Sequence, residues 1–199
     1  MVVGRGEGEE DGRHVIRTVA AATIALLVAG TAQAAPRHGL SVFGDLKYAL
    51  DFHHFDYVNP DAPKGGKLSL IGPVPRDSFD SFNNFILKGD PAQGLDLLFD
   101  SLMVRAMDEP DAVYGLVARE AEVAADRTSV TFTLRSEARF ADGSALDAAD
   151  VCDSFRLLKT HAIETIRITI RDVAACEIVD ATTVRYRFEG TRTRDLPTT

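Results

Sequence analysis

The stretch SVTFTLRSEARFADGSALDAADVCDSFRLLK, residues 129–159, decides how this chain folds locally. Its first residues alternate between apolar and polar: Val130, Phe132 and Leu134 fall on one side, and polar residues fall between them. This period of two is typical of a strand with one buried face. We therefore predict a strand that ends near Arg135.

A tight turn and a helix follow this strand. Phe140 precedes Ala-Asp-Gly, in which Asp142 is a turn former and Gly143 supplies the positive φ that the turn needs. Asp147 is placed to cap a helix, and the carboxylate of Asp150, three residues on, suits the positive end of the helix dipole. The unit is thus predicted to be strand, loop, turn and capped helix.

Apolar residues recur along the predicted helix at Val151, Phe155 and Leu158, the spacing of a buried helix face. Cys152 lies on the same side, and Cys176 falls in a likewise predicted strand. A disulfide can join such a pair in an oxidising compartment. The sequence favours packing of two small apolar thiols instead and leaves pairing open, because it does not fix the Cα separation. Two thiols alone do not make a zinc site.

The order of motifs in this stretch, L-R, then F-x-D-G, then D-A-A-D-V and S-F, resembles a signature of extracellular solute-binding proteins, family 5, the peptide and nickel class of ABC-importer receptors. The resemblance assigns structural roles to Arg135, Phe140, Asp142, Gly143, Asp147, Asp150 and Phe155. It implies a mixed fold, α+β or α/β, that forms the N-terminal part of a two-lobed, type II-like periplasmic binding protein.

Composition and motifs argue against a nucleic-acid-binding protein and against an enzyme. The chain has 199 residues, 45% hydrophobic and 26% charged, which is an ordinary globular balance. Its net charge of −8 is spread without a basic block, so nucleic acid is not an expected partner. The motifs G-x-S-x-G and H-E-x-x-H are absent. We therefore expect no catalytic residues, no cofactor and no enzymatic activity.

Residues 1–34 have the pattern of an export signal. Arg13 and Arg17 precede a charge-free run over residues 18–30, and Ala32-Gln33-Ala34 offers a small-x-small cleavage site. The acidic start, with four carboxylates before residue 12, means either a long leader or a true start further along. We expect cleavage before Ala35 and a periplasmic protein.

The segment after the signal indicates a particular subgroup of this family. The words G-D-L-K-Y at residues 44–48 and H-F-D-Y-V-N-P-D-A-P-K-G-G at residues 54–66 are similar to the N-terminus of the microcin C and oligopeptide-binding subgroup. The turn-forming residues concentrated at 59–66 predict that this segment is extended rather than helical. His53 and His54 are adjacent, so their imidazoles point apart on an extended chain and no metal site is expected.

A strand over residues 67–71 is predicted to lead into a loop at its C-terminal end, where ligands bind in open α/β folds. In the resembling family this region lines the ligand cleft. The resemblance therefore assigns ligand-binding roles to Arg76, Asp77, Ser78 and Phe79. The neighbouring Phe82 and Phe85 can stack on a ligand, although such clusters are more often core.

Further elements are predicted along the chain. Residues 95–103 have the apolar spacing of a short amphipathic helix. Residues 113–126 and the strand from residue 129 are predicted to form an antiparallel hairpin, as are residues 173–179 and 184–188. Asp108 and Glu109 are adjacent rather than opposed across a cleft, so a paired-carboxylate catalytic site is not expected.

The predicted organisation is a signal peptide at 1–34, the start of lobe I at 35–87, an inserted smaller domain at 88–189 and a return to lobe I at 190–199. The resemblance implies a monomeric periplasmic substrate-binding component of an ABC importer for oligopeptides or peptide-like compounds, with membrane permease subunits as partners, here truncated. A non-transporting remnant is the alternative, and a secreted hydrolase is least favoured. The ligand itself stays open.

Overall fold

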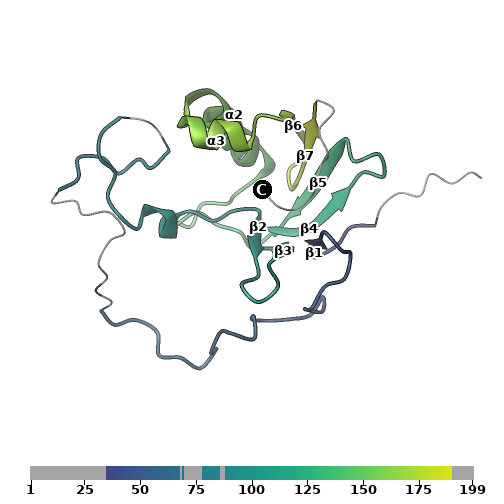
Figure 1. Ribbon diagram of the computed structural model, residues 1–199, viewed down its shortest axis with the longest axis horizontal. Coiled ribbons are helices and arrows are strands. Elements are labelled where there is room, and N and C mark those ends of the chain that lie inside the picture. The colour runs from purple at the N-terminus through teal and green to yellow at the C-terminus, as the bar shows by residue number, and fades with distance from the viewer. Residues whose placement is uncertain (1–34, 68, 70–77, 86–87, 190–199) are drawn as a thin grey trace, which may run out of the picture. The chain divides into compact units, whose positions relative to one another are not determined.

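The computed structural model describes residues 35–67, 69, 78–85 and 88–189 (Figure 1). Within these ranges the chain forms two antiparallel sheets and two α-helices. The small sheet has the order β1-β3-β2, with β1 at Gly39–Ser41, β2 at Met103–Arg105 and β3 at Ala112–Gly115. The fold is therefore mixed α and β, as predicted. No helix in the described ranges is long and apolar enough to cross a bilayer.

The larger sheet is built from the two predicted hairpins. Its order is β4-β5-β7-β6, with β4 at Ala118–Val123, β5 at Ser129–Leu134, β6 at Val173–Asp180 and β7 at Thr183–Phe188. Two aspartates shape the hairpin turns: Asp126 accepts the backbone N–H of Thr128 at 3.0 Å, and Asp180 accepts that of Thr182 at 2.8 Å. These short side chains hold the turns by local hydrogen bonds. The hairpin predicted for residues 173–179 and 184–188 is confirmed, whereas the first hairpin is confirmed only for β4, because residues 112–115 form β3 of the small sheet.

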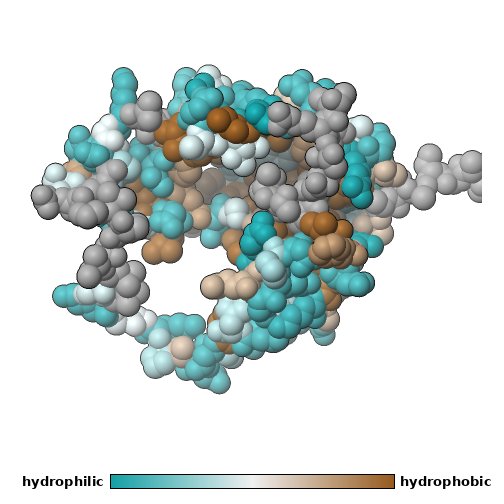
Figure 2. All heavy atoms as spheres, in the orientation of Figure 1, coloured by the Kyte–Doolittle hydropathy of each residue, from teal (hydrophilic) through white to brown (hydrophobic). Residues whose placement is uncertain are grey.

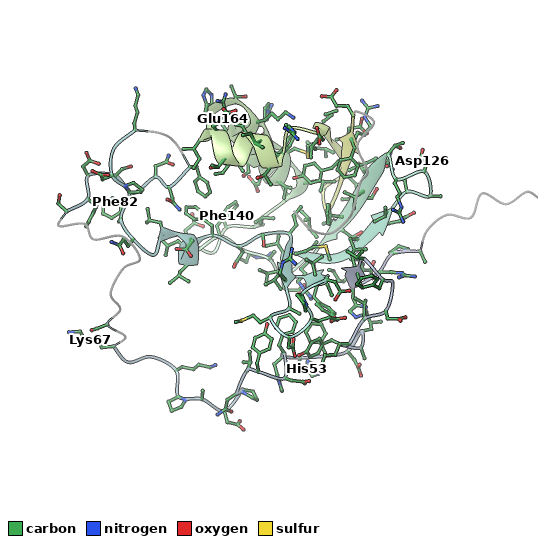
Figure 3. The ribbon with its side chains drawn as sticks, in the orientation of Figure 1. His53, Lys67, Phe82, Asp126, Phe140 and Glu164 are labelled. Carbon is green, nitrogen blue, oxygen red and sulfur yellow. A yellow bond between two sulfur atoms is a disulfide. The ribbon has the colours of Figure 1, made fainter. Side chains whose placement is uncertain are left out.

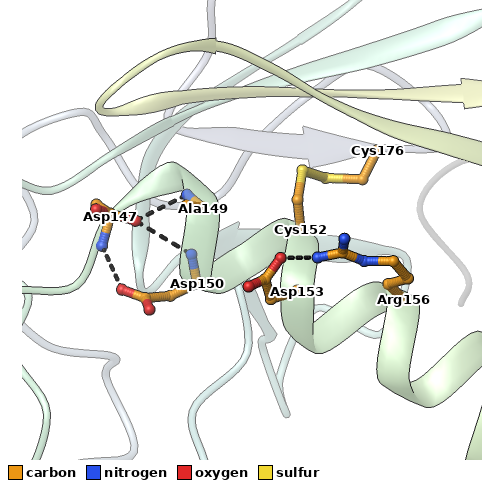
Figure 4. The surroundings of a disulfide bond; sticks show 7 residues. All are labelled: Asp147, Ala149, Asp150, Cys152, Asp153, Arg156 and Cys176. Atoms are coloured by element: carbon orange, nitrogen blue, oxygen red, sulfur yellow. Dashed lines mark hydrogen bonds and ion pairs between the residues drawn. A yellow bond between two sulfur atoms is a disulfide. The ribbon is translucent and has the colours of Figure 1, made fainter.

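Helix α2, Ala148–His161, begins where the sequence predicts (Figure 4). Asp147 Oδ1 accepts the backbone N–H groups of Ala149 and Asp150 at 2.8 and 3.1 Å, and Asp150 Oδ2 accepts the N–H of Asp147 at 3.0 Å. This reciprocal pair is a capping box with aspartate in both positions. The helix lies against β6 and β7 (Figure 1).

A disulfide between Cys152 and Cys176 joins α2 to β6 (Figure 4). The preference for two unpaired thiols was therefore wrong. The Cα atoms lie 5.4 Å apart, within the usual range for a bridge, and this separation arises only when the helix and strand pack together. Phe155 is only half-buried: its ring lies 5.3 Å from that of Tyr186.

An aromatic cluster packs on the small sheet. Tyr114 on β3 is fully buried, and its ring centroid lies 5.4 Å from that of Tyr48 and 5.2 Å from that of Phe52. A side chain at Gly39 would place its Cβ 2.9 Å from the Tyr114 ring, so β1 requires glycine there. Because β1 belongs to residues 35–87 and β3 to residues 88–189, the small sheet joins two predicted regions, whose boundaries stay a prediction.

The helix predicted over residues 95–103 is wrong. Only Leu95–Leu98 is helical, as the 3₁₀ turn η1, and Met103 already belongs to β2. Gly94, at φ 80°, precedes η1, and Phe99 is extended at φ −124°. The segment therefore has no length over which an amphipathic face can develop. The β-branched run after His161 forms the short helix α3, Glu164–Thr169.

Candidate functional site

Two loop segments, residues 78–85 and 88–92, run beside each other. The backbone N–H groups of Asp80 and Ser81 donate to the carbonyl of Asp90 at 3.0 and 3.2 Å, and the N–H of Ala92 donates to the carbonyl of Ser81 at 2.9 Å. Ser81 and Pro91 form an isolated parallel bridge. The family resemblance assigned ligand binding to Ser78 and Phe79 at the start of the first segment, but the sequence gave no sign of this pairing.

Side-chain oxygens give the first segment its shape. Ser81 Oγ accepts the backbone N–H of Asn83 at 3.0 Å, and Asn83 Oδ1 accepts that of Phe85 at 2.9 Å. The carbonyl of Phe85 accepts the N–H of Ile163 at 2.8 Å, which ties the segment to the connection between α2 and α3. The loop is thus held by hydrogen bonds at several points along its length.

Large apolar side chains lie exposed on these loops and on the following η1 region, and we call them the apolar loop surface. Phe82 is 74% exposed and Leu97 is 83% exposed. The full set is Phe79, Phe82, Leu97, Leu98 and Phe99. Figure 2 shows hydrophobic atoms reaching the surface beside η1, and Figure 3 labels Phe82. Large apolar groups exposed on neighbouring segments can mark a surface that another molecule covers.

Ring pairs hold three of these positions. Phe79 and Phe82 meet edge to face, with centroids 5.2 Å apart, and Phe85 meets Phe99 at 4.8 Å. Edge-to-face geometry is favourable because a ring's positive edge faces its neighbour's negative face. Each pair leaves apolar area free. Such a surface can take apolar side chains of a ligand.

The four predicted ligand-binding residues have different outcomes. Arg76 and Asp77 lie outside the described residues, as does most of the strand predicted at 67–71. Ser78 is exposed, and Phe79 is 53% exposed and belongs to the apolar loop surface. Their ligand-binding role stays a prediction.

Sequence reasoning missed Leu97, Leu98 and Phe99, because a helical period assigned this run to a core face. Pro91 and Gly94, just before it, were the signal that a long helix cannot start there.

Among the signature residues after β5, Arg135 makes hydrogen bonds to other parts of the chain. The backbone N–H of Arg135 donates to Val117 O at 2.9 Å, and its Nε donates to Leu116 O at 2.8 Å, which joins the end of β5 to the link between β3 and β4. Phe140 is 44% exposed, so it is not a core residue. The structural reading of the motif is consistent with these contacts.

The turn after Phe140 is ordered by one carboxylate. Asp142 Oδ1 accepts both the backbone N–H of Ser144 at 2.9 Å and its hydroxyl at 2.7 Å. These hydrogen bonds, led by the Ser144 hydroxyl, lower the pKa of Asp142 below its usual value of 3.8. Gly143 has φ 87°, as predicted.

The adjacent acids Asp108 and Glu109 anchor the extended N-terminal segment. Asp108 Oδ2 accepts hydrogen bonds from Lys47 Nζ and the Tyr48 hydroxyl, both at 2.6 Å. Lys47 Nζ also pairs with Asp56 at 2.8 Å. The hydrogen bonds from Lys47 and then Tyr48 lower the pKa of Asp108, and those to Asp108 and then Asp56 raise the pKa of Lys47. The carboxylate pair thus positions this segment.

The histidines of the same segment do not converge on a metal. In the described part of the chain, no group of three or more His, Cys, Asp or Glu side chains could hold a metal ion. His53 and His54 are exposed, and His54 Nδ1 lies 3.1 Å from the carbonyl of Phe55.

Residues 112–199 match the family model described as bacterial extracellular solute-binding proteins, family 5 Middle. These residues include both hairpins of the larger sheet and α2.

Two relatives from Agrobacterium fabrum are similar over most of the chain. The peptidoglycan-binding protein YepA is 39% identical over 183 residues, which cover 86% of this chain and 29% of YepA. The probable peptide-binding protein YejA is 36% identical over 183 residues, which cover 90% of this chain and 29% of YejA. The chain thus spans less than a third of the length of these relatives.

Solved structures match a smaller part. NikZ from Campylobacter jejuni, in complex with Ni(L-His), is 19% identical with a TM-score of 0.42, and 47% of this chain and 19% of NikZ are covered. NikA from Brucella suis, in complex with Fe(III)-EDTA, is 22% identical with a TM-score of 0.41 over the same shares.

Proposed function

We propose that this chain is part of a family 5 extracellular solute-binding protein, the periplasmic substrate-binding component of an ABC importer for oligopeptides or peptide-like compounds. The match of residues 112–199 to the family model carries the proposal, because the matched region encloses the capped helix and the four-stranded sheet. In this assignment the chain supplies the N-terminal part of a two-lobed protein, acts as a monomer and delivers ligand to membrane permease subunits. It binds and does not catalyse.

The names of two relatives support a peptide-like ligand. One is named for peptide binding and the other for peptidoglycan binding, and both are at least 36% identical to this chain. Peptidoglycan carries peptide stems, so the chemistry that the two ligands share is the peptide. A ligand from peptidoglycan is the second candidate, and YepA's name is the observation that favours it.

Two features support location in the periplasm. Residues 1–34 have the pattern of a cleaved export signal. Cys152 and Cys176 form a disulfide, which is typical of proteins that fold in an oxidising compartment.

The apolar loop surface is the proposed contact for ligand side chains. Arg76 and Asp77 would flank it in sequence, and Ser78 and Phe79 lead into it. Binding in the complete protein would cover these exposed groups from the opposite lobe. An apolar side chain that moves from water onto such a surface gains about 25 cal/mol for each Å² that it buries.

The test is ligand-dependent melting of the full-length protein that contains this chain. Tripeptides to pentapeptides, a peptidoglycan-derived stem peptide and Ni(L-His) are compared, each up to millimolar concentration. A ligand at 100 times its Kd stabilises the folded state by about 2.7 kcal/mol. We expect a rise in Tm with at least one peptide. No rise with any peptide, together with a rise for Ni(L-His), would refute the peptide assignment.

Two variants locate the contact. Phe82→Ala should weaken peptide binding at least tenfold, and Phe43→Ala is the matched control because Phe43 is 82% exposed and lies outside the apolar loop surface. Equal weakening in both variants would remove this surface from the ligand site without removing the peptide assignment.

A further inference from the structure

The core between α2 and the larger sheet is small. Its buried members are only Ala148, Cys152 and Val184 in the described residues, and the half-buried side chains around them are Phe132, Val151, Cys176 and Tyr186. Leu157, on the same helix, is 61% exposed. Because hydrophobic stabilisation scales with buried apolar area, so small a core holds a helix of this length weakly.

Further links attach α2 to the sheet and to the residues that lead into it, and at the helix N-terminus the Ala148 N–H donates to the carbonyl of Ala181 at 3.0 Å. Near the helix C-terminus, Lys159 Nζ donates to the carbonyls of Ile170, Arg171 and Val173 at 3.0, 2.7 and 2.6 Å. In the N-terminal half of α2, the disulfide joins Cys152 to Cys176 on β6, which lies 24 residues further along the chain. The disulfide is the covalent link, and its two sulfurs belong to the small core itself.

We infer that oxidation of Cys152 and Cys176 is the step that docks α2 on the sheet, and that an oxidant carrying a disulfide acts on this pair. The larger sheet forms in the reduced chain through its two hairpins, whose contacts are local in sequence, and through the pairing of β5 with β7 that joins them. Helix α2 then stays loosely attached until the bond closes. Cys152 is 8% exposed in the docked helix and Cys176 is half-buried, so Cys176 is the more accessible of the two sulfurs for an oxidising protein.

The reaction is thiol–disulfide exchange. The thiolate of one cysteine attacks a disulfide sulfur of the oxidant, forms a mixed disulfide and releases one oxidant thiolate. The second cysteine thiolate then attacks the sulfur of the first, which closes the Cys152–Cys176 bond and releases the second oxidant thiolate. Two electrons pass to the oxidant, and the two protons of the chain's thiols pass to solvent or to the released thiolates. A protein disulfide or oxidised glutathione supplies the oxidising equivalents.

Hydrogen exchange on the 199-residue chain, oxidised and after reduction with dithiothreitol, tests the inference. We expect amides of residues 152–161 to exchange at least tenfold faster after reduction, while amides of β4 and β5 change less than twofold. The variant that carries Cys152→Ala and Cys176→Ala is the control: it should exchange fast at α2 with or without reductant.

Equal protection of α2 in both redox states would overturn the inference, as would uniform loss of protection across β4 and β5, because the disulfide would then hold the whole sheet. Thiol titration gives a second readout: air-oxidised chain should contain no free thiol, and two free thiols in chain with protected α2 would also overturn it.

Discussion

Replacing Tyr114 by phenylalanine tests whether the small sheet and the extended N-terminal segment are held by one buried hydroxyl. Tyr114 is fully buried, donates to Glu109 Oε2 and accepts the backbone N–H of Tyr48 at 3.1 Å. Phenylalanine keeps the ring and its contacts with the aromatic cluster. It removes only the donor and the acceptor, so the Tyr48 N–H is left without its partner.

The cost follows from that loss. A buried donor left unsatisfied costs about 1–3 kcal/mol. For a domain of about 150–250 residues, 1 kcal/mol corresponds to about 2–4 °C in Tm. We therefore expect the Tm of Tyr114→Phe to fall by about 2–12 °C. Tyr114→Ala also loses the ring and should cost about 3–5 kcal/mol.

Thermal unfolding followed by circular dichroism measures both variants. Tyr57→Phe is the matched control, because Tyr57 is 44% exposed and its hydroxyl accepts only a long hydrogen bond of 3.4 Å from the Met107 N–H. Its Tm should stay within about 1 °C of wild type, as surface substitutions usually do. A Tyr114→Phe variant with the same Tm as the Tyr57→Phe control would refute the reasoning.

Three further predictions concern the larger sheet and the signature stretch. Asp147→Ala removes the cap of α2 and should cost about 0.5–2 kcal/mol in urea unfolding, whereas Asp153→Ala, at an exposed helix position, should cost less than about 0.5 kcal/mol. Gly143→Ala meets no atom within 4 Å but must adopt φ 87°, so it should destabilise by about 1 kcal/mol, and an unchanged urea midpoint would contradict this. Burial raises the pKa of Tyr186 from 10 to about 12, so the folded state keeps the phenol proton to higher pH than the unfolded state does. The contribution of Tyr186 to the free energy of unfolding is therefore full below pH 10 and falls as the pH rises towards 12. In melting curves recorded at alkaline pH, Tyr186→Phe should reduce this fall.

Local physics explains which elements were predictable. The alternation in residues 130–134, the turn at Gly143 and the cap at Asp147 depend on residues within a few positions of one another, and the structure has each of them. The helix prediction over residues 95–103 was wrong because one local signal was left out. Its apolar spacing was read without the glycine before it, and a short apolar run fits either a helix or an exposed loop.

The candidate site was predictable only in part. Phe79 was expected to face a ligand, and it lies exposed on the apolar loop surface. Leu97 and Phe99 join that surface from a segment that follows in sequence, and the pairing of Ser81 with residues 90–92 precedes them. No periodicity encodes such a pairing between loops, because it depends on backbone groups that every residue carries.

By itself the sequence determined the hairpins, the capped helix and the resemblance to a binding-protein family, since each rests on side chains near one another along the chain. Tertiary structure alone decided three things: that Cys152 and Cys176 pair, that Asp108 and Glu109 anchor the extended N-terminal segment, and that β1 joins β3. Each depends on the distance between groups separated by 24 or more residues. That distance is set by packing of whole elements and is not written in any local pattern.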